Sequence, residues 1–125
     1  MHTFKIPMKP VSLNQAYRKT RGGMMLSDKG RKFKDDCADF LREQFLEDEP
    51  LNYKIKIHIH VQLASRDMDV DNMTKLLIDS MKEIVFTDDK LIFDMRVTKE
   101  LHMERNEIHI KIEDCKGQKA SRWFD

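Results

Sequence analysis

The stretch YKIKIHIHVQL, at residues 53–63, alternates apolar and polar residues along its length. Side chains of a β-strand point to opposite faces in turn, so this alternation predicts a strand with two unlike faces. The apolar face, which we place in the core, consists of Ile55, Ile57, Ile59, Val61 and Leu63. The other face carries lysine, histidine and glutamine, so it is wet or covered.

Shorter alternating runs predict three more strands, at 2–6, 91–99 and 107–113. The side chains expected to be buried on the strand at 91–99 are Phe93, Met95 and Val97. Ser27 is a good helix N-cap, and the apolar residues after it keep a helical period to about Leu46. A second helical period predicts a helix from about Asn72 to Val85. Residues 9–26 are rich in turn formers, which favours a long loop or a small hairpin.

The chain has 125 residues, the length of one domain, and 40% of them are hydrophobic, enough for one modest core. The order β-α-β-α-β-β predicts an α+β fold, with a mixed four-stranded sheet and two helices packed on one face. We expect one domain at 1–115 and a flexible tail at 116–125. Because no apolar run could span a bilayer or serve as a signal peptide, we expect a soluble cytoplasmic protein without a membrane partner.

The net charge of +1 gives no sign of a nucleic-acid partner, but the charges are unevenly distributed. Residues 16–34 carry seven basic residues against one acid, and residues 35–49 carry seven acids against one arginine. Such asymmetry can form an anion-binding surface on a neutral protein. A solvated helix face of mixed charge would have the same composition.

The stretch RDMDVDNMTK, at 66–75, places three carboxylates at alternate positions, followed by an asparagine and a lysine. If the strand continues this far, Asp67, Asp69 and Asp71 project to one face at intervals of about 6–7 Å. Like charges this close repel one another unless a cation lies among them. Carboxylate oxygens at this density favour Mg²⁺ or Mn²⁺ over zinc.

Three other interpretations of these acids compete with a nuclease metal site. A calcium-binding EF-hand loop requires Gly and Glu where this chain has Asn72 and Ile78, so that class is excluded. A phosphoryl-transfer aspartate follows a strongly apolar parallel strand, and the strand before these acids alternates instead. A structural role would make Asp71 a helix N-cap paired with Lys75, which explains only one of the acids.

A nuclease metal site explains the whole row but needs a further carboxylate from elsewhere in the fold. Asp88 and Asp89 are candidates, provided that the fold brings them back toward Asp71. Lys75 follows Asp71 by one helical turn, where it could neutralise charge that develops on the phosphate or the leaving oxygen. Spacing alone does not distinguish this role from a surface ion pair.

Four residues, Asp69, Asp71, Asn72 and Lys75, form the pattern D-x-D-N-x-x-K, and Asp88-Asp89 lead into KLIFDMRV. With PVSLNQAYR at 10–18 and LSDKGRKFKDD at 26–36, they make the chain resemble the RusA family of Holliday junction resolvases over about residues 4–112. The resemblance implies a homodimeric, Mg²⁺-dependent endodeoxyribonuclease of DNA recombination and repair. Such an enzyme binds four-way DNA junctions and nicks two strands of like polarity symmetrically.

By the same resemblance, Asp69 and Asp71 are metal ligands, Asp89 is the third essential carboxylate with Asp88 beside it, and Lys75 is the catalytic lysine. The best-known member of the family carries a run of arginines just before the first motif aspartate. At this place the present chain has only one arginine, Arg66, and adds an acid, Asp67. The residues expected to contact DNA are Asn14, Tyr17, Arg18, Lys19, Arg21, Arg31, Lys32, Arg66 and Asn72.

Two function classes therefore follow from the sequence. One is the resolvase enzyme, with a nuclease acting on other branched forms as its variant, and the other is a module that binds branched DNA without cutting it. A module that only binds DNA has no reason to set carboxylates against a polyanion. The acid set together with Lys75 therefore favours the enzyme.

Overall fold

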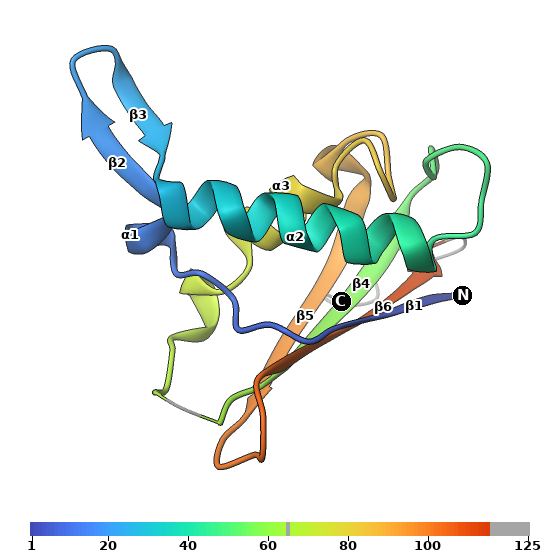
Figure 1. Cartoon of the computed structure of the whole chain (residues 1–125). Helices are drawn as coiled ribbons and strands as arrows, with labels where there is room; N and C mark the ends of the chain where they lie inside the picture. Colours follow the sequence, from blue (N-terminus) through green and yellow to red (C-terminus); the bar gives the residue numbers. More distant parts are fainter. Residues whose placement is uncertain (65, 116–125) are drawn as a thin grey trace, which may run out of the picture.

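The main sheet has four strands, paired in the order β1-β6-β4-β5 (Figure 1). In chain order they are β1 (His2–Ile6), β4 (Ile55–Gln62), β5 (Ile92–Glu100) and β6 (Glu107–Asp114). β4 runs parallel to β5, and β6 is antiparallel to β1 and to β4. Figure 1 shows the computed structural model, which describes residues 1–64 and 66–115. The tail predicted at 116–125 lies outside these residues.

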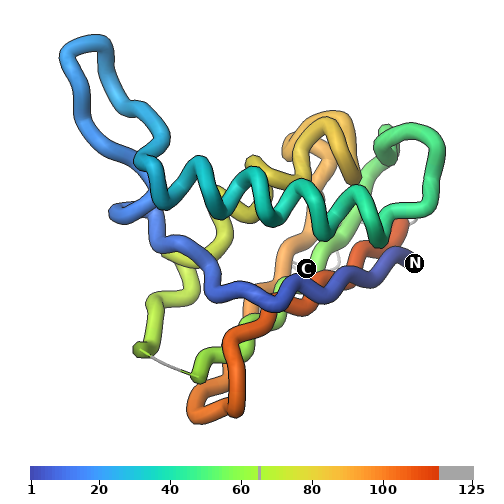
Figure 2. Tube along the Cα trace, in the orientation of Figure 1, coloured from blue at the N-terminus to red at the C-terminus, as the bar shows by residue number. Residues whose placement is uncertain are grey.

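Two helices, α2 (Asp28–Gln44) and α3 (Lys75–Met81), lie on one side of this mixed sheet, so the predicted α+β class is confirmed. The structure adds a one-turn helix, α1 (Leu13–Ala16), and a hairpin of β2 (Tyr17–Thr20) and β3 (Gly23–Leu26). Of the two predictions for residues 9–26, the hairpin is correct. Figures 1 and 2 show it projecting beyond the start of α2, away from the four-stranded sheet.

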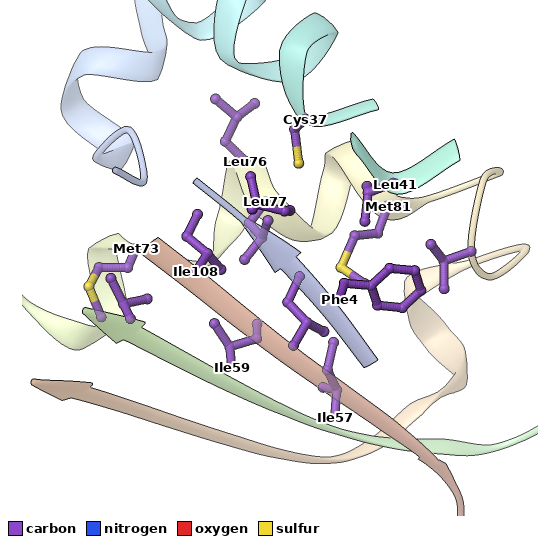
Figure 3. Close-up of a cluster of buried hydrophobic side chains, with 14 of the residues drawn as sticks. Phe4, Cys37, Leu41, Ile57, Ile59, Met73, Leu76, Leu77, Met81 and Ile108 are labelled. Atoms are coloured by element: carbon purple, nitrogen blue, oxygen red, sulfur yellow. The ribbon is translucent and has the colours of Figure 1, made fainter. Parts of the chain in front are cut away.

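The core forms between the sheet and the two helices. Every second residue of β4 is buried, as the alternation predicts. Ile57 and Ile59 of this strand pair with Ile112 and Ile110 of β6, and side chains of α2 and α3 pack against this face of the sheet (Figure 3). Cys37 of α2 is part of this core, and burial raises the pKa of its thiol to about 12. Cys37 therefore stays protonated and unreactive at neutral pH.

The predicted burial of β5 is wrong for two of its three residues. Phe93 is 61% exposed and Met95 is 49% exposed, whereas Val97 is partly buried against the core. β5 is an edge strand of the sheet, and its pairing with β4 is irregular at its start, between Ile55 and Lys56. The apolar side chains near this irregularity therefore lie at the margin of the core.

The helix predicted at 72–85 is shorter in the structure. Val70–Asn72 forms a separate 3₁₀ turn, η1, and α3 begins only at Lys75. The helix ends at Met81 because Lys82 is extended and Glu83 has a positive φ of 71°. The apolar pattern of the sequence continues beyond Met81 because Val85 and Phe86 are also fully buried. These two residues lie outside the helix, so the pattern predicts its end too late.

The start of α2 is joined closely to the end of α1. Ser27 is its N-cap, as predicted, and the Ser27 hydroxyl accepts from the Gly30 amide at 3.0 Å. The Ser27 amide donates to the Ala16 carbonyl at 2.8 Å. A Cβ atom on Gly30 would lie 3.1 Å from the Ala16 Cα and closer still to the Ala16 oxygen. A glycine is therefore required where the two helices meet.

None of the helices in residues 1–64 and 66–115 has both the length and the apolar character of a bilayer span.

Candidate functional site

The acidic motif does not continue β4. That strand ends at Gln62, Asp67 and Asp69 lie in the following loop, and Asp71 lies in η1. The expectation of three carboxylates in a row along a strand is therefore wrong. Asp69 and Asp71 are both exposed and remain two positions apart, at the start of the 3₁₀ turn that leads into α3.

Two lysines from other parts of the fold hold the motif loop, residues 66–69. Lys99 of β5 donates to Asp67 Oδ1 at 2.7 Å and to the Met68 carbonyl at 2.9 Å. Lys9 donates to the Arg66 carbonyl at 3.1 Å. The hydrogen bond from Lys99 also lowers the pKa of the Asp67 carboxyl. Asp67 therefore anchors the loop to β5, which explains an acid that the family pattern does not include.

A groove of about 530 Å³ lies between the N-terminal loop, residues 9–15, and the motif loop. Three residues predicted to contact DNA line it: Asn14, Arg66 and Asn72. Asp69 lies in the same groove, so the structure brings a predicted metal ligand together with these DNA-contact candidates. Lys9 and Lys29 add two cations to its lining. An anionic chain lying here would meet positive charge and amide groups close to a carboxylate.

Lys75 is the first residue of α3, and its amine donates to Asp79 Oδ1 at 3.1 Å. The structural interpretation of the motif, with Asp71 as the cap of this helix and the partner of Lys75, is therefore wrong. Thr74 occupies the N-cap position, and Asp71 lies before it in η1. This leaves the Asp71 carboxylate without either of the two structural roles that the spacing suggested.

Tyr17, a predicted DNA-contact residue, also contacts Asp79, the partner of Lys75. Its hydroxyl donates to Asp79 Oδ2 at 3.1 Å, across 62 residues of sequence. Burial, together with the hydrogen bond to Asp79, raises the pKa of Tyr17. The structure therefore connects the residue after α1 to the lysine of the motif through Asp79.

The second acidic pair lies in another 3₁₀ turn, η2 (Asp89–Leu91), just before β5. Asp88 caps this turn by accepting from the Lys90 amide at 3.0 Å, whereas Asp89 is exposed. The hydrogen bond and charge of Asp79, and then the charge of Asp89, raise the pKa of Lys75. Within residues 1–64 and 66–115, no three His, Cys, Asp or Glu side chains converge closely enough to hold a metal ion.

The other predicted DNA contacts lie outside the groove, on exposed surfaces. Arg18 and Lys19 lie on β2, and Arg21 lies at the turn of the hairpin. Arg31 and Lys32 lie in the first turns of α2, where Lys32 pairs with Asp36 at 3.0 Å. These cations are therefore exposed on the hairpin and at the start of α2, and one of them is already paired with an acid.

The residues that sequence reasoning missed are Lys9, Lys29, Asp79 and Lys99. Only one of them left a local signal, because Asp79 follows Lys75 by four residues, the spacing of neighbours on a helix. Lys99 reaches the motif from a strand 32 residues further along, and no local pattern indicates such a contact.

The sequence profile of the family described as Endodeoxyribonuclease RusA matches residues 7–113, which include both acidic segments and the N-terminal loop. The chain belongs to the RusA family of endodeoxyribonucleases. A relative named crossover junction endodeoxyribonuclease RusA, from Escherichia coli O139:H28, is 33% identical over 102 residues, which cover 79% of this chain and 84% of the relative. One from Enterobacteria phage HK97 is 30% identical over 118 residues, 93% of this chain and 97% of the relative.

Membership of the RusA family makes this protein a nuclease. The exposed acids and the groove described above therefore belong to an enzyme that hydrolyses DNA.

Proposed function

We propose that this protein cuts four-way DNA junctions by paired, symmetric nicks in two strands of like polarity, in DNA recombination and repair. The observation that carries the proposal is the groove in which Arg66, Asn14 and Asn72 lie beside Asp69. A phosphate backbone in this groove would be bound by cations and amides next to a carboxylate. The names of the relatives, which specify crossover junctions, support a branched substrate over a linear duplex.

The cofactor in this proposal is Mg²⁺, with Mn²⁺ as a substitute, held by Asp69, Asp71 and Asp89 with Asp88 beside them. The donor chemistry suits this ion, because carboxylate oxygens are the hard ligands that Mg²⁺ prefers. Within residues 1–64 and 66–115 these carboxylates do not converge, so binding of the ion would have to bring them together. When bound, Mg²⁺ polarises the scissile phosphodiester and lowers the pKa of an attacking water. Asp69, Asp71 and Asp89 are exposed and accessible to an ion, whereas Asp88 is already engaged as the cap of η2.

Lys75 has the role of stabilising negative charge on the reacting phosphate. Its side chain is 55% exposed, so its amine is accessible to DNA. Of its three amine hydrogens, one is donated to Asp79, and two are left for phosphate oxygens. A lysine is cationic at neutral pH, and the hydrogen bond and charge of Asp79 raise the pKa of Lys75 further.

We also propose that the active form is a two-fold symmetric homodimer. A four-way junction offers two equivalent strands, and a two-fold dimer presents two equivalent sites to them. Recognition then depends on the shape of the branch and on its backbone, with base contacts limited to the cut site.

A plasmid that extrudes a cruciform tests the cutting activity and the pairing of nicks together. Paired nicks within one binding event convert the supercoiled plasmid directly to a linear form, whereas independent nicks first accumulate an open circle. We expect linear product with Mg²⁺ or Mn²⁺, none with EDTA, and none from a matched plasmid without the inverted repeat. Binding of the cruciform without any cutting would instead favour the non-catalytic module.

Replacing Lys99 with methionine should raise the Mg²⁺ concentration for half-maximal cleavage by about tenfold. Lys99 holds the loop that carries the proposed ligand Asp69, and residues that hold metal ligands in place commonly contribute this much to metal affinity. Methionine keeps an unbranched stem but removes the bonds to Asp67 and Met68. Lys111→Met, which removes only a pair with Glu113 on β6, is the control. The measurement is a Mg²⁺ titration of junction cleavage, and equal midpoints for the two variants would contradict the role of Lys99.

A further inference from the structure

Asp79 is bound at both of its carboxylate oxygens, by groups from different parts of the fold. Oδ1 accepts from Lys75 at 3.1 Å, and Oδ2 accepts from the Tyr17 hydroxyl at the same distance. The Asp79 side chain is 23% exposed, so it lies below the surface on which the Lys75 amine is accessible. Hydrogen bonds at both oxygens restrict rotation of a carboxylate about its last bond.

The pair is not placed where it would stabilise the helix. Lys75 is the first residue of α3, at the positive end of the helix dipole, and Asp79 lies two residues before the last, toward the negative end. Both charges therefore have the sign that the dipole disfavours. Lysine followed by an acid four residues later is also the weaker order for a helical ion pair. The pair must therefore be explained by something other than helix stability.

Tyr17 extends the arrangement to the junction between α1 and α2. It directly follows Ala16, whose carbonyl accepts from the Ser27 amide and lies against Gly30. The Tyr17 side chain is partly buried and packs against the core, so its hydroxyl is held firmly. A rigid donor on one oxygen of Asp79 fixes the other oxygen, which in turn limits the range of a long and flexible lysine.

We propose that Asp79 is the positioning residue of the RusA site in this chain: held by Tyr17, it orients the Lys75 amine toward the reacting phosphate. This inference rests on the proposed role of Lys75 in cleavage. Asp79 itself touches neither metal nor DNA, and it acts only through Lys75. The same contact gives Tyr17 a role in the site that does not require it to bind DNA.

Single-turnover cleavage of a saturating four-way junction, with separate measurement of junction affinity, tests the proposal. Asp79→Asn keeps the size of the side chain but removes the charge and replaces one acceptor oxygen with an amide NH2 group, which donates. We expect its cleavage rate to fall by about 10- to 100-fold, as for a misplaced reacting group, with junction Kd within about twofold. Tyr17→Phe should lower the rate by only about three- to fivefold, the effect of one lost hydrogen bond.

A double-mutant cycle separates positioning from general damage to the fold. If Asp79 acts only through Lys75, Asp79→Asn should change the rate by less than about twofold in a Lys75→Ala background. A structural role would lower the rate equally in both backgrounds. Asp36→Asn is the matched control, because Asp36 forms the same lysine-to-aspartate pair with Lys32 on α2. It should cleave a saturating junction at the wild-type rate.

The outcomes distinguish this inference from the proposed function. Cleavage by Lys75→Ala at the wild-type rate would remove the role of Lys75, and the role of Asp79 with it. A slow Lys75→Ala enzyme together with an unchanged or faster Asp79→Asn enzyme would overturn the positioning role alone. Loss of rate by Asp79→Asn in both backgrounds, with a lower melting temperature, would overturn it in favour of a structural role.

Discussion

Replacing Asp71 with asparagine should reduce junction cleavage by about three orders of magnitude or more, because the proposed site then loses a charged metal ligand while the size of the side chain is kept. Asp71 is exposed in η1 and neither caps α3 nor pairs with Lys75, so its removal should leave the fold intact. Junction binding should persist or become tighter, since one negative charge facing the DNA is removed. Rates and affinities are measured on the same labelled junction at saturating Mg²⁺.

Asp67→Asn is the appropriate comparison, because it removes a carboxylate from the same loop. Asp67 is bound to Lys99, and the Met68 carbonyl still accepts from Lys99 in the variant. At saturating Mg²⁺ we expect cleavage within about threefold of the wild-type rate, the size of a weakened surface contact. Equal rates for Asp71→Asn and wild type would remove Asp71 from the metal site, and an equally inactive Asp67→Asn would place Asp67 within it.

Replacing Gly30 with alanine should lower the free energy of unfolding by about 1–3 kcal/mol, the usual cost of overpacking. The added methyl group would overlap the Ala16 carbonyl, and backbone atoms cannot rotate away as a side chain can. This cost outweighs the gain of about 1 kcal/mol that alanine normally has over glycine in a helix. Because Tyr17 follows Ala16, cleavage should slow as well. Chemical denaturation and single-turnover cleavage measure the two effects.

The hairpin supplies the matched control for Gly30→Ala. A Cβ atom on Gly22 would meet no atom within 4 Å, so Gly22→Ala should change stability by no more than about 0.5 kcal/mol. If Gly30→Ala were as stable as Gly22→Ala, the close approach of α1 and α2 would not be a constraint on this fold.

The elements whose pattern is local were predictable. The alternation of β4 and the apolar stripe of α2 depend on residues within a few positions of one another, and both predictions are confirmed. The exposure of Phe93 and Met95 was not predictable, because the sequence of β5 does not state that it lies at the edge of the sheet. Strand order depends on contacts between distant segments.

For the site, too, local patterns were predictable and contacts between distant segments were not. The motif identified Asp69, Asp71 and Lys75 from spacing, but Lys75 has an aspartate four residues away on each side, and spacing could not choose between them. The fold makes the choice, because Asp71 lies in a 3₁₀ turn before the helix and Asp79 lies within it. Asp67 is extra to the family pattern by sequence alone, but only the fold shows that it binds Lys99 of β5.

The position of β6 has a consequence for the synthesis of the protein. β6 lies between β1 and β4, so neither of them gains this neighbour until residues 107–114 have left the ribosome. Helical and hairpin segments can form earlier, whereas pairing across such long stretches of chain is slow. Until then, the backbone edges of β1 and β4 that pair with β6 lack these hydrogen-bond partners. We expect the sheet to close only after β6 has emerged.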